Sequence, residues 1–241
     1  MALRPWLREI IEADAKGGSA VIDAIVRTTG GTILAEAEVT AKSVVYTKEA
    51  FDIGRITLGD GDAAFAKGIA LELLRSDVHQ ARCVGTFVLG GLAALDADAL
   101  LTLRHHVSQD KDWRVQEILA KAFDQFCRDT GYEAALPVIR DWLTSPSANT
   151  RRAVTEGLRI WTTRPYFRDH PAVAIALLAP LRGEDSEYLR TSVGNALRDI
   201  SKKHPNLVRQ EVMSWDLAQS GVMKVYKLAT RFLSGRQGLI L

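Results

Sequence analysis

The stretch Val115-Gln116-Glu117-Ile118-Leu119 recurs twice further along the chain, and this recurrence decides the fold. The second copy is Val154-Thr155-Glu156-Gly157-Leu158, and the third is Val193-Gly194-Asn195-Ala196-Leu197. Successive copies begin 39 residues apart, and each follows a short polar turn. Self-similarity at a period of about 40 residues is typical of solenoids built from stacked helix pairs.

Apolar residues at helical spacing predict helices on both sides of these copies. Two helices are expected at about 63–74 and 78–94, where Gly85, Gly90 and Gly91 permit close packing. Helix pairs are expected at 97–107 with 113–127, 133–144 with 149–161, 171–181 with 187–203, and 206–215 with 221–233. We therefore predict an all-α, HEAT-like solenoid of antiparallel helix pairs (an α-α superhelix) with a concave basic groove. It forms one domain over residues 1–241, atypical over 1–95 and regular over 96–241.

The first 62 residues are less regular. Helical segments are expected around 6–11 and 21–26, whereas residues 32–48 mix helix-favouring and strand-favouring residues. A helix is favoured for 32–48, and a β-hairpin is the alternative. The turn-rich stretch 52–62 ends at Asp62, a candidate N-cap.

Composition excludes several classes of protein. With 47% hydrophobic and 25% charged residues, the 241-residue chain resembles ordinary soluble globular proteins. No run approaches the roughly 18 apolar residues of a membrane span, and the mixed charge of the N-terminus is unlike a secretory signal. We expect a cytoplasmic monomer that does not bind membranes.

The cysteine and histidine residues lack ligand spacing. Cys83 and Cys127 lie inside apolar helical patterns and are predicted to be small buried hydrophobic residues. His105 and His106 are adjacent, so on a helix they point about 100° apart and are poorly placed to share a metal ion. No metal site and no cofactor are predicted.

The net charge of +2 conceals an asymmetry along the chain. Residues 1–110 carry a net charge of −4, and residues 111–241 carry +6. The basic excess coincides with the repeat copies, as expected if the repeats face a polyanion; an ordinary solvated surface is the alternative.

Polar and aromatic residues recur on one face of the repeat helices. Trp113 and Glu117 are one turn apart, as are Arg152 and Glu156, with Arg159 on the same face. Each has a structural alternative: a hydrophobic staple for Trp113, a helix-dipole interaction for Glu117, and an ordinary surface pair for Arg152 with Glu156. The third copy adds Arg190, Asn195, Arg198, Asp199, Lys202 and Lys203.

The remaining side chains of this kind divide between surface and core. Arg198 with Asp199 is either a functional pair or an ion-pair ladder between repeats. Trp142 and Trp215 are predicted core residues, whereas Trp161 is balanced between core and surface.

The runs 151–159 and 190–205, which contain the second and third copies, resemble the HEAT-repeat DNA alkylation repair glycosylases, and more closely the AlkC branch than the AlkD branch. The resemblance covers about residues 60–235. It implies a groove that holds double-stranded DNA, alkylated or branched, and a monofunctional, metal-free glycosylase that removes small cationic bases such as N3-methyladenine.

The resemblance also implies roles for individual residues. Trp113, Glu117 and Arg152 match an aromatic, an acidic and a basic position of the AlkD branch, with glutamate in place of aspartate. Asn195 replaces an aromatic residue of that branch. Glu117 and Glu156 match catalytic glutamates of the AlkC branch, so both are expected to be catalytic, with Trp113 as their aromatic partner. The expected DNA contacts are Arg114, Arg151, Arg152, Arg159, Trp161, Arg190, Asn195, Arg198, Asp199, Lys202 and Lys203.

These residue types suit the chemistry. The glycosidic bond to a cationic base breaks through an oxocarbenium-like transition state, which a carboxylate stabilises and an indole face attracts. The alternatives are a non-catalytic relative that binds branched or damaged duplex, and a protein-binding HEAT scaffold.

Overall fold

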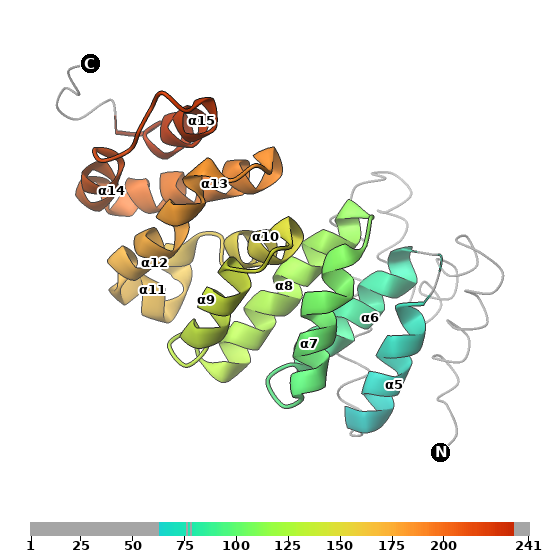
Figure 1. Ribbon diagram of the computed structural model, residues 1–241. Helices are drawn as coiled ribbons and strands as arrows, with labels where there is room; N and C mark the ends of the chain where they lie inside the picture. The colour runs from blue at the N-terminus through green and yellow to red at the C-terminus, as the bar shows by residue number, and fades with distance from the viewer. Residues whose placement is uncertain (1–62, 76, 78, 234–241) are drawn as a thin grey trace, which may run out of the picture. The chain divides into compact units, whose positions relative to one another are not determined.

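The structure, a computed structural model, describes residues 63–75, 77 and 79–233 (Figure 1). The chain divides into two compact units, Met1–Asp129 and Thr130–Leu241. Each unit is considered by itself below. The predictions for 6–11, 21–26, 32–48 and Asp62 fall outside the described residues.

The described part of the first unit consists of antiparallel helices. They are α5 (Ala63–Leu73), α6 (His79–Leu92), α7 (Ala97–His105), the short 3-10 helix η1 (Val107–Gln109) and α8 (Trp113–Thr130). α6 packs against α5 and α7. It also meets α8 at Gly90, where an added Cβ would lie 2.6 Å from the Ala122 Cβ. Gly85 makes a similarly close approach to the Ala70 carbonyl of α5, so both glycines serve the close packing that the sequence predicts.

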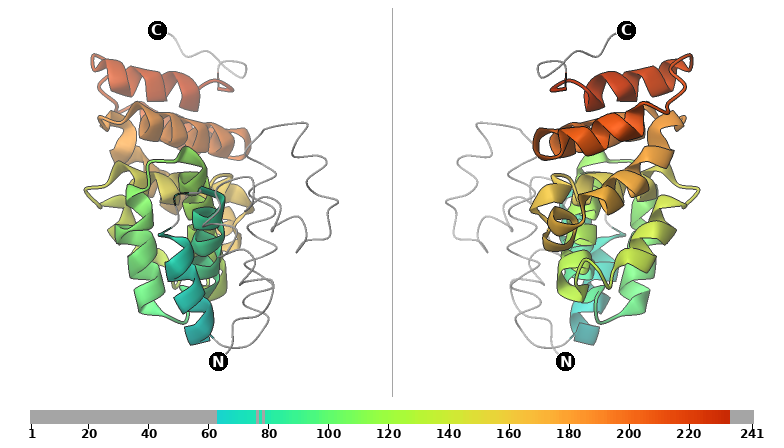
Figure 2. Two further views of the ribbon diagram at one scale, coloured as in Figure 1. Left: turned by 90° about the vertical axis from the view of Figure 1, so that its right-hand side faces the viewer. Right: turned by 90° about the vertical axis from the view of Figure 1, so that its left-hand side faces the viewer.

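The second unit continues the pairing around one long helix. It contains α9 (Leu136–Leu143), α10 (Ala148–Gly157), η2 (Trp161–Thr163), α11 (Pro165–Asp169), α12 (Pro171–Leu178), η3 (Ala179–Gly183), α13 (Glu187–Lys203), α14 (Pro205–Val212) and α15 (Ser220–Ala229). α13 packs against α10, α12, α14 and α15. Figure 2 shows α15 lying beside α13 in both views. The described residues contain no strand, and the predicted all-α helix-pair fold is confirmed.

Polar turns before the repeat helices supply their N-caps. The Ser147 hydroxyl accepts a hydrogen bond from the Thr150 amide at the start of α10, and Ser186 accepts one from Leu189 at the start of α13. Asp112 accepts from the Arg114 amide at the start of α8. These bonds satisfy amides that would otherwise lack partners in the first helical turn. The turns therefore set where each repeat copy begins.

Burial follows the repeat. The valines at the first position of each copy and the leucines at the fifth are fully buried, at 0% exposure: Val115, Val154, Val193, Leu119, Leu158 and Leu197. Glu117, Glu156 and Asn195 at the third position are half-buried. Residues one and five lie about one turn apart on a helix, whereas residue three points away from them. The repeat thus encodes a buried stripe and a polar position beside it.

The end of α10 differs from its predicted position. The sequence predicts a helix over 149–161, but α10 ends at Gly157. Ile160 has φ 57°, the single positive φ of a non-glycine residue in the described part of the chain. This turn sends Trp161 into η2 and the core, and the short helix α11, which the sequence did not predict, follows at Pro165–Asp169.

The predicted core residues are buried where the structure describes them. Trp142 is 1% exposed, and Trp215 is 6% exposed. Cys83 and Cys127 are buried as predicted, and burial raises the pKa of the Cys83 thiol to about 12. Within the described residues, no helix has both the length and the apolar character to cross a membrane.

Candidate functional site

The first candidate surface is the exposed side of the α8 N-terminus. Trp113 is 51% exposed, and the Arg114 guanidinium carbon lies 5.9 Å from the centroid of its ring. Glu117 lies one turn further on and is half-buried. Lys121 follows after another turn; burial lowers the pKa of its ammonium group, and the Glu117 carboxylate opposes that shift. We call Trp113, Glu117 and Lys121 the α8 face.

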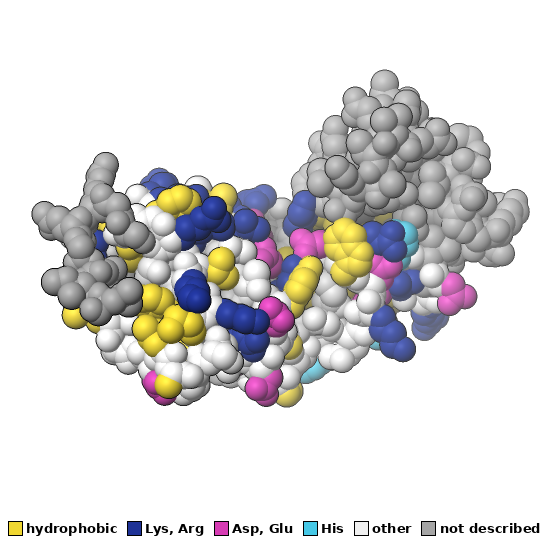
Figure 3. All heavy atoms as spheres, turned by 90° about the horizontal axis from the view of Figure 1, so that it is seen from above, with side chains coloured by type: hydrophobic (Ala, Val, Ile, Leu, Met, Phe, Trp, Pro, Cys, Tyr) yellow, Lys and Arg dark blue, Asp and Glu magenta, His cyan; other side chains and the backbone are white. Residues whose placement is uncertain are grey.

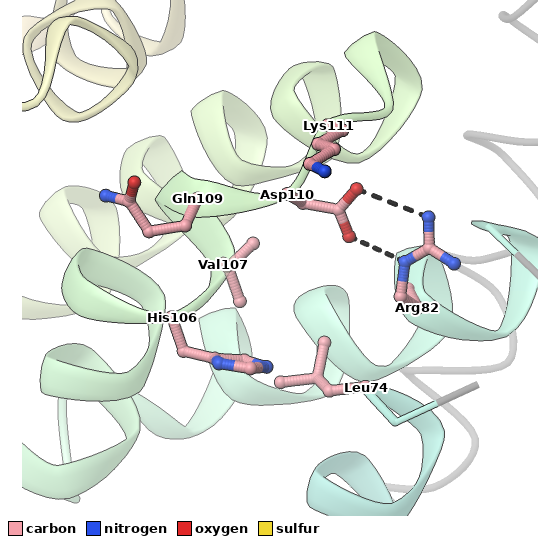
Figure 4. A pocket seen from close by; sticks show the side chains of 7 residues that line it. All are labelled: Leu74, Arg82, His106, Val107, Gln109, Asp110 and Lys111. Atoms are coloured by element: carbon pink, nitrogen blue, oxygen red, sulfur yellow. Dashed lines mark hydrogen bonds and ion pairs between the residues drawn. The ribbon is translucent and has the colours of Figure 1, made fainter. Parts of the chain in front are cut away.

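Charged pairs hold the loop that precedes the α8 face. Arg82 on α6 donates two hydrogen bonds to the Asp110 carboxylate, at 2.6 and 3.2 Å (Figure 4). Arg114 donates to both carboxylate oxygens of Asp112, at 2.9 and 2.7 Å, and these bonds lower the Asp112 pKa to about 2. The Gln116 amide donates to the Val107 and Asp110 carbonyls. The start of α8 is therefore tied to α6 and η1, which positions Trp113.

A pocket of about 330 Å³ lies beside this loop. Figure 4 shows it between the Arg82–Asp110 pair and the side chains of Leu74, Val107 and His106. Its one charged pair is already matched, with both acceptor oxygens of Asp110 facing Arg82. We assign this pocket to the support of the loop.

The second candidate surface lies on α10 and α13 in the second unit. The Arg152 side chain is buried, and its guanidinium carbon lies 4.5 Å from the centroid of the Tyr188 ring. Glu156, one turn after Arg152, pairs with Arg159 at 3.5 Å. Arg159 also approaches the Asp199 carboxylate of α13, at 3.9 Å.

Asp199 is the centre of an ion-pair cluster on this surface. It is 9% exposed, and its carboxylate lies 2.9 Å from the Lys202 ammonium and 3.3 Å from the Arg198 guanidinium. Burial raises the Asp199 pKa, but these cations outweigh burial and lower it overall. The Asn195 side chain accepts a hydrogen bond from Arg198 at 2.9 Å. We call Glu156, Arg159, Asn195, Arg198 and Asp199 the α10–α13 strip. The predicted ladder between repeats is present here, in the Arg159–Asp199 pair.

The third repeat position differs among the copies in what surrounds it. Glu156 and Asn195 each contact the arginine three residues later, Arg159 and Arg198 respectively. In the first copy that place is taken by Ala120. No guanidinium from the same helix turn therefore neutralises Glu117, and its nearest helical cation is Lys121, four residues on.

Two predicted contact arginines are turned toward loops. Arg151 donates to the Ser145 carbonyl and, at 2.7 Å, to the Glu184 carboxylate. Arg190, 39 residues later, donates to the carbonyls of Glu184 and Asp185. Both guanidinium groups fasten the turn that precedes their helix, so the structure gives them a role in the fold.

The prediction that Trp161 contacts a ligand on the surface is wrong. Its side chain is 0% exposed and packs edge to face on Phe167, with ring centroids 4.7 Å apart. The positive φ of Ile160 turns the chain so that the indole enters the core. The helical periodicity of α10 does not extend across that turn.

Tyr188 is a residue that sequence reasoning missed. It is 62% exposed at the start of α13, and its ring covers the Arg152 guanidinium of the neighbouring repeat. The corresponding places in the other copies hold Asp110 and Asn149, so the repeat gives no signal for an aromatic residue there. An exposed tyrosine in a first helical turn was the sole clue.

Basic side chains at the end of α13 remain accessible. Lys202 and Lys203 are exposed, and Arg159 retains 43% of its side-chain exposure. Figure 3 shows a face of the molecule on which Lys and Arg side chains gather beside Asp, Glu and exposed hydrophobic groups. Among the described residues, no group of three or more His, Cys, Asp or Glu side chains is arranged to hold a metal ion.

Comparison with known proteins identifies relatives. Residues 59–226 match the DNA alkylation repair enzyme family. The chain is 48% identical to AlkD2 from Streptococcus mutans, with a TM-score of 0.73, over 76% of this chain and 90% of that one. It is likewise 48% identical to smu.31 from Streptococcus mutans UA159, with a TM-score of 0.72, over 75% of this chain and 91% of that one.

More distant likenesses agree. The Pseudomonas fluorescens alkylpurine DNA glycosylase AlkC, in a structure bound to DNA containing an abasic site analog, shares the fold with a TM-score of 0.63 at 19% identity. That likeness covers 95% of this chain and 62% of AlkC. "Uncharacterized protein YhaZ" of Bacillus subtilis (strain 168) is 35% identical over 78 residues, which are 31% of this chain and 22% of YhaZ.

Proposed function

Because the chain belongs to the DNA alkylation repair enzyme family, we propose that it is a monofunctional DNA glycosylase that binds double-stranded DNA. Its substrates in this proposal are small cationic alkylated bases such as N3-methyladenine, whose N-glycosidic bond it hydrolyses. It acts as a cytoplasmic monomer.

The observation that carries the proposal is the α8 face. A half-exposed indole and a carboxylate lie one helical turn apart, and the place where the later copies have an arginine is an alanine. A carboxylate stabilises a developing cation best when a neighbouring guanidinium does not neutralise it. We therefore assign the main electrostatic role to Glu117.

The reaction needs little from the protein beyond this charge. A methylated base leaves as a neutral molecule, so protonation of the leaving group is unnecessary, and the sugar becomes oxocarbenium-like as the bond breaks. Glu117 stabilises that positive charge and orients the attacking water. The Trp113 ring attracts the cationic base through its negative face. Glu156 is the second carboxylate in the proposal.

Phosphate contacts come from exposed cations of the second unit. Arg159, Arg198, Lys202 and Lys203 are the cations near the α10–α13 strip, with Arg114 added from the α8 face. Such side chains give affinity that depends on salt and not on base sequence. Support comes from AlkC, a protein of the same fold whose structure is bound to DNA.

Release of free base from methylated duplex DNA tests the activity. We expect the wild-type protein to release N3-methyladenine, detected by chromatography with mass spectrometry. Glu117→Gln removes the charge with little change in shape and lowers the rate roughly 100-fold. Glu133→Gln is the matched control, since Glu133 is exposed outside both candidate surfaces. Absence of release at high protein concentration would sink the glycosylase proposal.

A second candidate function is non-catalytic binding of damaged or branched duplex. The observation that favours it is the Glu156–Arg159 pair, which neutralises one of the two carboxylates. This alternative predicts salt-dependent DNA binding without base release. A protein-binding scaffold predicts neither, so one binding titration and one release assay separate the three.

A further inference from the structure

A second pocket lies in the second unit, away from the residues proposed to be catalytic. It measures about 700 Å³ and is formed by the end of α13, the first turns of α14 and the residues after α15. Ser201, Lys202, Asn206, Arg209 and Phe232 are among the side chains that line it. Its volume is within the range of small-molecule sites, about 300–1,000 Å³.

The described lining of this pocket is positively charged. It contains one lysine and one arginine and no carboxylate. The Lys202 ammonium bonds Asp199 at 2.9 Å, and Asp199 is itself shared with Arg198. Arg209 donates to the neutral Asn206 side chain at 2.9 Å, which leaves its charge uncompensated by that bond. Lys203 adds a further exposed cation next in the chain. An anion is therefore the favoured occupant.

An aromatic ring completes the lining. Phe232 is 51% exposed, unusual for a phenylalanine, and the Lys202 ammonium lies 5.1 Å from its ring centroid. The Arg231 guanidinium carbon lies 6.0 Å from the same ring. An exposed ring flanked by cations is the combination by which proteins hold nucleotides, with the base stacked on the ring and the phosphate on the cations.

We propose that this pocket binds one nucleotide unit, its base against Phe232 and its phosphate at Lys202 and Arg209. An acidic peptide would satisfy the cations but would leave the ring without a stacking partner. The nucleotide comes either from a DNA strand or from the free pool, since both carry the same chemistry. The inference does not depend on glycosylase activity, because none of Trp113, Glu117 and Glu156 lines the pocket.

Titration calorimetry on the full chain tests the pocket with four probes: dAMP, deoxyadenosine, inorganic phosphate and the oligonucleotide d(A)4. We expect saturable binding of dAMP that weakens with salt, and much weaker binding of deoxyadenosine and of phosphate alone. Phe232→Ala weakens dAMP binding by roughly 5- to 150-fold, and Phe232→Trp restores it. Arg209→Gln weakens it roughly tenfold.

Tyr188→Ala is the matched control, because Tyr188 is an exposed aromatic beside a guanidinium at the other end of α13. It should leave dAMP binding unchanged, and circular dichroism should show every variant folded. Tighter binding of d(A)4 than of dAMP identifies a strand as the source, and the reverse order identifies the free nucleotide. The proposal is overturned if phosphate alone binds as tightly as dAMP, or if Phe232→Ala binds dAMP like the wild type. Base release is not a readout here, so failure of this site is distinct from failure of the glycosylase proposal.

Discussion

The guanidinium carbon of Arg152 lies 4.5 Å from the ring centroid of Tyr188, so a buried cation in one repeat supports an exposed aromatic in the next. A cation over an aromatic face is attracted by the ring quadrupole, and the attraction grows when the cation is withdrawn from water. The contact joins α10 to α13 beside the α10–α13 strip.

This contact predicts a measurable coupling between the two residues. Tyr188→Ala should lower the free energy of unfolding by about 1 kcal/mol, because the stacked pair is lost. Tyr188→Phe should change it little, because the ring face remains. Urea denaturation of both single variants and of the double variant with Arg152→Gln gives the coupling energy. A coupling near zero would contradict the stacking account.

The Asp112 carboxylate predicts a stability term that disappears in acid. Arg114 lowers the Asp112 pKa from 3.8 to about 2 in the folded protein. The folded state therefore binds this proton less readily than the unfolded chain, so the stabilisation is complete above about pH 4 and is lost as the pH falls toward 2. Solvent screening of the partly exposed pair limits it to about 1 kcal/mol.

Asp112→Asn isolates that charge because asparagine keeps the N-cap bond to the Arg114 amide. The variant should melt below the wild type at pH 7, and the gap should close between pH 4 and 2. Asp141→Asn, on an exposed side chain of α9, is the control. A gap that stays constant with pH would show that the charge of Asp112 is not the cause.

Gly90 predicts a steric limit at the contact of α6 with α8. A Cβ added there would meet the Ala122 Cβ at 2.6 Å and its Cα at 2.7 Å, so backbone has to shift. Gly90→Ala should destabilise the protein by about 1–3 kcal/mol. Gly68→Ala, on the exposed side of α5 with nothing within 4 Å, should instead stabilise it by up to about 1 kcal/mol. Thermal denaturation of the two variants should give shifts of opposite sign.

Ile160 predicts a gain in stability from a smaller residue. Its φ of 57° brings a β-branched side chain into the left-handed region, which costs about 1–2 kcal/mol for a residue with a Cβ. Because the side chain is 48% exposed, Ile160→Gly removes more strain than packing and should raise the free energy of unfolding by roughly 1 kcal/mol. Ile160→Ala keeps the Cβ and should show no such gain. Denaturant titration of both variants decides between these outcomes.

The predicted helices and the observed ones agree where local signals are strong. α13 begins and ends where the sequence predicts, because Ser186 caps its start and Pro205 follows its end. α10 was predicted too long, because the apolar residues after Gly157 continue a helical rhythm that the left-handed Ile160 interrupts. A single backbone angle leaves no trace in hydrophobic spacing.

The candidate site was predicted by residue type and only in part by surroundings. Glu117 and Glu156 occupy equivalent positions in the repeat, but Glu156 pairs with Arg159 whereas Glu117 has Ala120 in that place. That difference is readable in the sequence. The burial of Trp161 and the exposure of Tyr188 are not, because both depend on which way the chain turns between helices.

The sequence by itself determined the all-α repeat fold, since valine and leucine at the first and fifth positions of each copy produce a buried stripe through helical geometry alone. It also determined the family, through the second and third copies. Tertiary structure decided which polar side chains are accessible: it buried Trp161, turned Arg151 and Arg190 onto loop carbonyls, and placed Tyr188 over Arg152. The physical reason is that helical periodicity is a local property, whereas pairing between side chains of different repeats depends on how the loops bring those helices together.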